Sequence, residues 1–291
     1  MGEAIQLSVP GPHGPRKVRL SSPSRVLWPD LGVTKLDLAE YVIAVGEAFV
    51  AANGERPVSL ERYPDGVGGE SFFSKNPPRG APAWARSVTV TYPSARAHPQ
   101  LVIDEVATAV WAVQMNTVVF HPWPSRAGAS DFPDQLRVDL DPQPGTDFAD
   151  AVPAARELER RMPDAVTTSW WKEERGEKVF ADFNQANRDR TIAGAYSPRA
   201  LPHAPVSTPV TWEELGDVDP REFTVRTVPE RLRTAGDPWA HMHDEPGSIA
   251  TLLEWWERDL RDGLGELPFP PDYPKMPGEP PRVQPSRARK D

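Results

Sequence analysis

The stretch Leu136-Arg137-Val138-Asp139-Leu140-Asp141-Pro142 decides the fold, because it reads as a β-strand that ends at its proline. Side chains alternate between the two faces of a strand, so the apolar residues point one way and Asp139 and Asp141 point the other way. Two carboxylates this close repel each other, and a divalent cation removes that penalty. Because hard oxygen ligands suit Mg²⁺ or Mn²⁺, the pair predicts a metal site. The alternative is an ordinary surface pair of aspartates at a strand end.

A third carboxylate strengthens the metal interpretation. Asp182 is the lone acid of the apolar stretch Val179-Phe180-Ala181-Asp182-Phe183. A buried and unpaired carboxylate is costly, so Asp182 needs either a metal or a cationic partner. Three acids on two strands are the usual scaffold for phosphoryl transfer with two metal ions. The alternative is that Asp182 pairs with a nearby arginine such as Arg190.

The remaining pattern predicts many short elements joined by proline-rich turns, since the chain has 35 prolines in 291 residues. Thr34 is a plausible N-cap for a helix that follows it. We expect helices at residues 35–52, 105–116, 147–162, 212–215 and 249–262, and strands at residues 58–62, 88–92, 100–103 and 117–121. Residues 166–171 and 178–183 read as the two strands of a hairpin around Arg175-Gly176.

Composition sets the limits on class and location. The chain is 38% hydrophobic and 26% charged, has no cysteine and has no apolar run long enough to span a bilayer. We therefore expect a cytoplasmic globular protein without a membrane segment, with no disulfide or cysteine-ligated zinc. The net charge of −9 is unusual for a protein that binds nucleic acid. Residues 211–262 carry 13 acidic and 6 basic residues, so the rest of the chain can still present a local basic face.

Several further motifs accompany the aspartates. Upstream lie Arg25-Val26-Leu27-Trp28-Pro29 with Thr34-Lys35, Arg62-Tyr63-Pro64-Asp65-Gly66, Phe72-Phe73-Ser74-Lys75 and His121-Pro122-Trp123. Downstream lie Asn184-Gln185, Arg190-Thr191-Ile192-Ala193 and Ala195-Tyr196-Ser197-Pro198-Arg199. Together with the two aspartate motifs, these blocks resemble the polymerase domain of the bacterial multifunctional ligase-polymerase, a member of the archaeo-eukaryotic primase superfamily. The resemblance runs from about residue 22 to residue 215 and is that of a stand-alone homologue.

The resemblance implies a fold and a reaction. The fold is mixed α/β, a primase-like domain over residues 1–262 with two mixed sheets and flanking helices, followed by a proline-rich basic tail over residues 263–291. The reaction is metal-dependent nucleotidyl transfer that extends a primer 3′-hydroxyl at a DNA end. The implied partners are DNA ends with a 5′-phosphate, nucleoside triphosphates, a Ku-type end-binding protein and a DNA ligase, in non-homologous end joining.

The resemblance also assigns residues to roles. Asp139, Asp141 and Asp182 hold the Mn²⁺ or Mg²⁺ ions and are catalytic. The nucleotide-binding positions are His121, Gln185, Arg190 and Arg199, and the DNA-binding positions are Arg25, Lys35, Phe72, Phe73 and Lys75. Simpler alternatives exist for some of these. Phe72 and Phe73 can belong to the core, Lys35 can be a solvated residue of a first helical turn, and His121 can be a hydrogen-bonded core histidine.

One motif of the family is missing from this chain. Between the two aspartate motifs the family has a Ser-Gly-x-x-Gly-x-His-x-aromatic segment whose donors hold the incoming triphosphate. This chain has no Ser-Gly pair, and it has no histidine between His121 and His203. We therefore expect impaired polymerisation, and a non-catalytic module that binds DNA ends is the alternative function. A third alternative is a defective deletion product that folds poorly.

Overall fold

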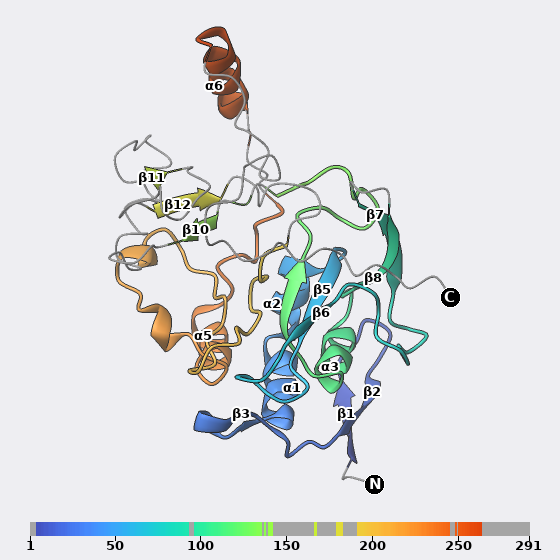
Figure 1. Ribbon diagram of the computed structural model, residues 1–291. Coiled ribbons are helices and arrows are strands. Elements are labelled where there is room, and N and C mark those ends of the chain that lie inside the picture. The colour runs from blue at the N-terminus through green and yellow to red at the C-terminus, as the bar shows by residue number, and fades with distance from the viewer. Residues whose placement is uncertain are drawn as a thin grey trace, which may run out of the picture.

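The computed structural model describes residues 4–92, 96–135, 137, 139–141, 166–167, 179–182, 191–244, 248 and 250–263. One larger sheet with helices against it forms the body, and a small sheet lies beside it (Figure 1). The predicted mixed α/β class is confirmed. The larger sheet is antiparallel in all of its pairings, so the small sheet is the one mixed sheet among the described strands.

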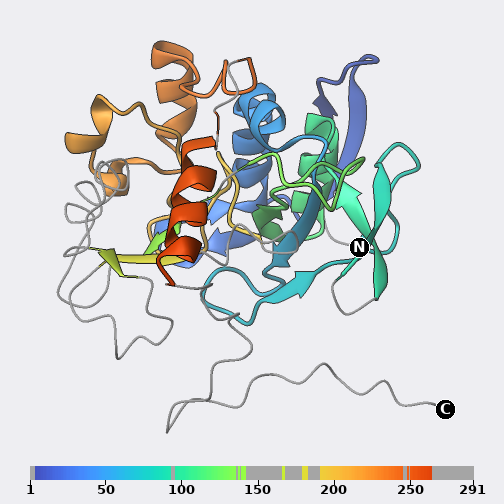
Figure 2. The same ribbon diagram turned by 90° about the horizontal axis from the view of Figure 1, so that it is seen from above.

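The N-terminal part consists of two short antiparallel pairs. β1 (Ala4–Val9) and β2 (Arg16–Ser21) form a hairpin, and β3 (Val26–Trp28) pairs with β4 (Val33–Thr34). In both views the β1–β2 hairpin and helix α5 lie on opposite sides of helix α1 (Figures 1 and 2). The hairpin therefore extends the body on the side away from the C-terminal helices.

The predicted helix over residues 35–52 is two helices, α1 (Lys35–Ala44) and α2 (Gly46–Asn53). Thr34 is the N-cap as expected, since its side chain accepts from the Asp37 backbone N–H and Asp37 accepts from the Thr34 N–H at 2.7 Å. Val45, with φ −95° and ψ 5°, separates the two helices, and the next residue packs closely on another helix. A Cβ on Gly46 would lie 2.6 Å from the side chain of Val106, the first residue of α3 (Val106–Gln114).

The larger sheet is centred on β5 (Pro57–Arg62). β9 (Thr117–Pro122) pairs with β5, and so do β8 (Ala97–Val102) and β6 (Phe72–Ser74); β7 (Ser87–Thr91) pairs with β8. Val58 and Leu60 belong to the main core together with Phe120, whose ring meets Phe49 of α2 at 5.2 Å between centroids. Because side chains alternate, the residues between them face the opposite side of the sheet.

The small sheet contains the strands with the aspartates. β12 (Val179–Asp182) lies between β10 (Asp139–Asp141), to which it is antiparallel, and β11 (Val166–Thr167), to which it is parallel. The predicted hairpin between residues 166–171 and 178–183 is therefore wrong. A hairpin reverses direction between neighbouring strands, whereas Val166 pairs with Val179 in a parallel register. The helix predicted at 147–162 and the tail from residue 264 lie outside the described residues.

The C-terminal part is helical and irregular. It contains the 3₁₀ turns η4 (Glu214–Gly216) and η5 (Pro220–Glu222), and the helices α5 (Val228–Ala235) and α6 (Ala250–Arg261). The helix expected at 212–215 is reduced to η4, and the one expected at 249–262 is confirmed as α6. Sequence reasoning missed α5, although a proline in its first turn and Gly236 after its end are usual boundary signals. Within the described part of the chain, no helix has the length and apolar character to cross a bilayer.

Candidate nucleic-acid and metal site

The register of the small sheet brings the predicted metal positions together. Asp139 pairs with Asp182, and Asp141 pairs with Phe180 two residues further along. Directly opposed residues of antiparallel strands share a face, and so do residues two apart, so positions 139, 141 and 182 lie on one face. Their carboxylates are oxygen donors of the kind that Mn²⁺ and Mg²⁺ prefer, so this donor set fits the implied metal. The side chains of Asp141 and Asp182 lie outside the described residues, so their convergence on an ion stays a prediction.

Two arginines fix the approach to β10. Arg137 donates from Nη1 to the carbonyl of Pro122 at 2.7 Å and from Nη2 to the carbonyl of Trp123 at 2.9 Å. Burial, and then the neighbouring charge of Arg56, lower the pKa of Arg137 to about 10. Arg56, which is 1% exposed, holds Asp134 through two hydrogen bonds of 2.6 and 3.0 Å. The strand of Asp139 therefore begins next to the end of β9.

His121 lies on β9 and faces the side of the sheet opposite the core. Its Nε2 lies 3.0 Å from Oε2 of Glu61 on β5, and the two side chains are 14% and 16% exposed. Glu61 also accepts hydrogen bonds from the hydroxyls of Tyr63 and Ser71. The hydrogen bond from His121 is the main cause that lowers the pKa of Glu61, and burial opposes it. His121 is thus hydrogen-bonded, as the core-histidine alternative requires, but it is not enclosed.

The two phenylalanines are exposed, so the core alternative is wrong for both. Phe72 is 44% exposed and Phe73 is 54% exposed. They lie on opposite faces of β6: Phe73 meets the ring of His121 at 5.1 Å between centroids, and the guanidinium of Arg62 lies 4.9 Å from the ring of Phe72. The exposed Lys75 places its ammonium 4.8 Å from the ring of Tyr92. Phe73 therefore offers an open aromatic surface next to His121, of the kind on which bases stack.

Arg25 and Lys35 lie close together, but only Arg25 is exposed. Lys35 is 3% exposed, and its ammonium donates to the carbonyl of Ser21 at 3.2 Å. Burial first, and the charge of Arg25 second, lower the pKa of Lys35 to about 8. Arg25 lies 3.5 Å from Asp65, an exposed and long contact. Because Lys35 is buried, the expectation of a merely solvated lysine is wrong. Among the described residues it has no carboxylate partner.

The segment 194–199 is fixed against β9. Gly194 donates to the carbonyl of Phe120 at 3.0 Å, and the hydroxyl of the buried Ser197 accepts from the Phe120 N–H at 2.9 Å. A Cβ on Gly194 would lie 2.2 Å from Oδ1 of Asn53, so only glycine fits there. Arg199 is exposed at the end of this segment. The other two predicted nucleotide-binding residues, Gln185 and Arg190, lie outside the described residues.

Two residues that sequence reasoning missed belong to this site. Tyr63 donates to Glu61, and burial followed by this hydrogen bond raises the pKa of Tyr63 to about 12. The charge of Arg199 acts on Tyr63 in the opposite direction, which places Arg199 near the cluster. Glu61 was detectable in the sequence, because it is the lone acid in the strand that runs from Val58 to Arg62.

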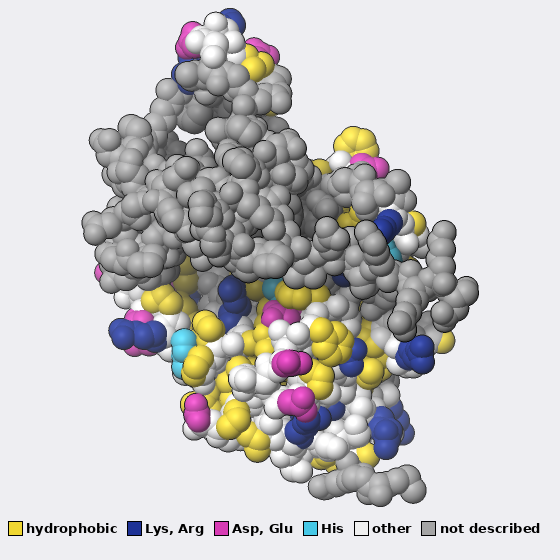
Figure 3. All heavy atoms as spheres, viewed as in Figure 1, with side chains coloured by type: hydrophobic (Ala, Val, Ile, Leu, Met, Phe, Trp, Pro, Cys, Tyr) yellow, Lys and Arg dark blue, Asp and Glu magenta, His cyan; other side chains and the backbone are white. Residues whose placement is uncertain are grey.

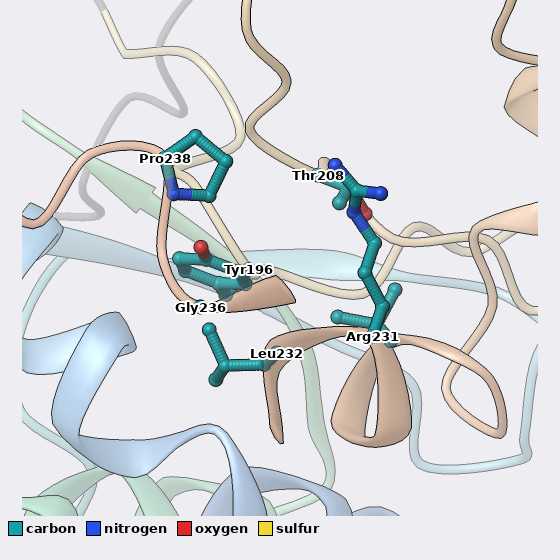
Figure 4. A pocket seen from close by; sticks show the side chains of 7 residues that line it. Tyr196, Thr208, Arg231, Leu232, Gly236 and Pro238 are labelled. Carbon is teal, nitrogen blue, oxygen red and sulfur yellow. The ribbon is translucent and has the colours of Figure 1, made fainter. Parts of the chain in front are cut away.

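Neither the charge of the described surface seen in Figure 3 nor a hollow beside α5 marks another site as clearly. On the face seen in Figure 3 the lysines and arginines are dispersed among acidic and hydrophobic side chains. A hollow beside α5 is lined by Tyr196, Thr208, Val228, Arg231, Leu232, Gly236 and Pro238 (Figure 4). Its empty volume is about 160 Å³, which is below the roughly 300 Å³ at which ligand pockets begin. The hollow is therefore too small for a nucleotide.

Comparison with curated proteins finds relatives over most of the chain. The multifunctional non-homologous end joining protein LigD of Mycolicibacterium smegmatis is 28% identical over 89% of this chain, and that of Pseudomonas aeruginosa is 31% identical over 84%. The chain spans 40% and 35% of the lengths of these two proteins. The first alignment has 309 positions but includes 89% of 291 residues, about 259, so about 50 positions have no counterpart here.

The comparison of structures agrees with that of sequences. The polymerase domain from Mycobacterium tuberculosis ligase D in complex with DNA superposes with a TM-score of 0.72 at 25% identity, and the match covers 79% of this chain and 99% of that one. The family model of the LigD primase-polymerase domain matches residues 34–158 and 153–239. Its two parts meet at 153–158, between the aspartate motifs, where the Ser-Gly segment is missing. Because these matches cover most of the chain, it belongs to the family of LigD primase-polymerase domains.

Proposed function

We propose that this chain binds 5′-phosphorylated DNA ends and acts in non-homologous end joining. The observation that carries the proposal is the buried ammonium of Lys35, next to Arg25 and without a carboxylate partner among the described residues. Similar proteins support the proposal. The two relatives are named as non-homologous end joining proteins, and the structure of the similar polymerase domain is a complex with DNA. A Ku-type protein and a DNA ligase are the partners proposed for this role.

The physical reason is that Lys35 lacks the anion that its charge requires. Desolvation disfavours the ammonium, and the neighbouring guanidinium adds repulsion. A phosphate monoester at a DNA end carries nearly two negative charges and several acceptor oxygens, so it relieves both costs. Arg25 reaches the same group from the surface. An internal phosphodiester carries one charge, so the site favours ends.

Nucleotidyl transfer is a second candidate function, and the register of Asp139 opposite Asp182 favours it. In this role Asp139, Asp141 and Asp182 hold Mn²⁺ or Mg²⁺, which supplies charge neutralisation for phosphoryl transfer when bound. Arg199 neutralises phosphate charge of a nucleoside triphosphate, and Gln185, Arg190 and His121 complete the nucleotide site. Positioning errors of about 1 Å cost about 100-fold in rate, so the missing Ser-Gly segment makes this activity very weak.

The experiment compares binding to a duplex end with and without a 5′-phosphate, for the wild type and Arg25→Ala/Lys35→Ala. The wild type prefers the phosphorylated end, and the double variant loses that preference while it keeps most of the salt-dependent affinity for DNA. If the double variant binds the phosphorylated and the unphosphorylated end more weakly by the same factor, the two residues contribute only general electrostatic attraction to DNA. Primer extension with Mn²⁺, run beside it, is expected to be very weak or absent. Robust primer extension by the wild type that disappears in Asp139→Ala would make nucleotidyl transfer the main function and end binding the secondary one.

A further inference from the structure

Glu61 is a carboxylate on the sheet face proposed to bind nucleic acid, where its negative charge would repel phosphate groups. It lies on the sheet face that also carries His121 and the exposed Phe73, because Phe73 pairs with Glu61 and His121 pairs with Ser59. Among the described residues its one ion-pair partner is His121. The next residue, Arg62, lies on the other face and donates to the carbonyl of Met115 at 2.7 Å. In the part of the chain that the structure describes, Glu61 therefore neutralises no arginine.

The hydrogen bonds of Glu61 fix its geometry. One oxygen, Oε1, accepts from the hydroxyls of Tyr63 and Ser71, and the other, Oε2, meets Nε2 of His121. Because the carboxylate is ionised and has no proton to give, the hydrogen of this contact belongs to Nε2. The hydrogen bond of one ring nitrogen sets the state of the other. The Nδ1 atom of His121 is therefore left for a ligand.

We infer that Glu61 is a positioning residue: it orients His121 so that Nδ1 accepts a hydrogen bond from a sugar hydroxyl of a nucleotide whose base stacks on Phe73. The ring of His121 lies 5.1 Å from that of Phe73, so one nucleotide unit reaches both. The nucleotide belongs either to a DNA overhang or to a free nucleoside triphosphate. The inference rests on the proposed function, that the chain binds nucleic acid at DNA ends.

The test is a double-mutant cycle on the full chain with Glu61→Ala and His121→Ala, measured with two probes. One probe is a duplex with a 3′ overhang, and the other is ATP with Mn²⁺. Glu61→Ala is expected to weaken binding of one probe by about tenfold, as loss of an orienting carboxylate commonly does. Since Glu61 acts through His121, the double variant is no weaker than His121→Ala alone. The probe that loses affinity identifies the source of the nucleotide.

Glu70→Ala is the matched control, because it removes an equal charge at an exposed position; it is expected to bind within threefold of the wild type. The spectroscopic readout is the ¹⁵N signal pair of the His121 ring, assigned by its loss in His121→Ala. Glu61→Ala shifts this pair away from the Nε2–H form. Glu61→Gln, which keeps an acceptor without the charge, retains most of the Nε2–H signature and of the binding.

Each outcome decides the inference. Additive effects of the two substitutions, unchanged ring signals in Glu61→Ala, or no binding of either probe by the wild type overturn it. The preference for a 5′-phosphate, measured on a blunt duplex, is expected to be the same in all variants because Lys35 and Arg25 are intact. If the wild type shows no preference for a 5′-phosphate, the proposed end-binding function is refuted. The double-mutant cycle with the two probes still tests the role of Glu61 in that case.

Discussion

Replacing Lys35 with Met removes a charge that the folded protein holds at a cost. The pKa of Lys35 falls from its ordinary 10.5 to about 8, mainly through burial, which corresponds to roughly 3 kcal/mol against the charged form. Methionine keeps the length of the buried stem, but the carbonyl of Ser21 loses its donor, which costs about 1–2 kcal/mol. At pH 7 we therefore expect Lys35→Met to be about 1–2 kcal/mol more stable than the wild type.

The same gain has a definite pH dependence. Lys35 is a base with a depressed pKa, so the folded state holds fewer protons than the unfolded state between about pH 8 and pH 10.5. The stability of the wild type therefore rises with pH in this window, while the variant has no such term. Between pH 7 and pH 9.5 we expect the advantage of the variant to shrink by about 2 kcal/mol. Urea unfolding at the two pH values measures this change.

The binding assay completes the prediction. Lys35→Met is expected to lose the preference for a 5′-phosphorylated end by about tenfold or more, because a charge-assisted hydrogen bond contributes about 1.5–3 kcal/mol. Lys17→Met, on the exposed side of β2, changes the net charge equally and serves as the control. A variant that is less stable at both pH values by the same amount shows that the ammonium is not desolvated. An intact phosphate preference shows that the phosphate binds elsewhere.

Three further predictions concern the framework and the metal positions. Arg56→Met leaves Asp134 without its buried partner and is expected to cost about 2–3 kcal/mol in urea unfolding, whereas Arg126→Met, on the exposed side of the same carboxylate, changes stability by less than about 1 kcal/mol. Gly194→Ala drives a Cβ into Asn53 and is expected to lower stability by about 1–3 kcal/mol; Gly128→Ala, with nothing within 4 Å of its Cβ, is the control for the same denaturation. Asp139→Asn is expected to abolish high-affinity Mn²⁺ binding seen by electron paramagnetic resonance, and unchanged binding places the ion elsewhere.

Sequence pattern predicted those features of the fold that depend on neighbouring residues alone. Thr34 identified the start of α1 because a capping side chain acts within four residues. The break after Ala44 was not predicted, and the close approach of Gly46 to Val106, sixty residues away, cannot be read from local pattern either. The same limit explains the wrong hairpin. Turn residues show where a chain changes direction but not which strand pairs with which. The parallel pairing of β11 with β12 is set by tertiary contacts.

The candidate site shows the same division. The motifs identified Phe72 and Phe73 as a pair, but only the register of β6 separates them, with Phe73 facing His121 and Phe72 against Arg62. The burial of Lys35 was not predictable, because a lysine in a first helical turn is usually solvated. Its burial comes from the contacts of that turn with the end of β2, which no local pattern encodes.

About 50 positions of the Mycolicibacterium smegmatis relative have no counterpart here, and we expect their absence to affect the two proposed functions unequally. Arg25 and Lys35 lie in the N-terminal pairs and α1, and their hydrogen bonds link residues 21–37 and 65. None of these contacts involves residues 136–190, where the two parts of the family model meet. β10 still pairs directly with β12, so the strands of Asp139 and Asp182 are neighbours without the missing segment. The resemblance implies that this segment holds a triphosphate in the family. Among the described residues, Arg199 offers charge for that role but no comparable set of fixed donors. We therefore expect the proposed binding of a DNA end to be separable from nucleotide addition, because Arg25 and Lys35 keep their contacts without the missing segment.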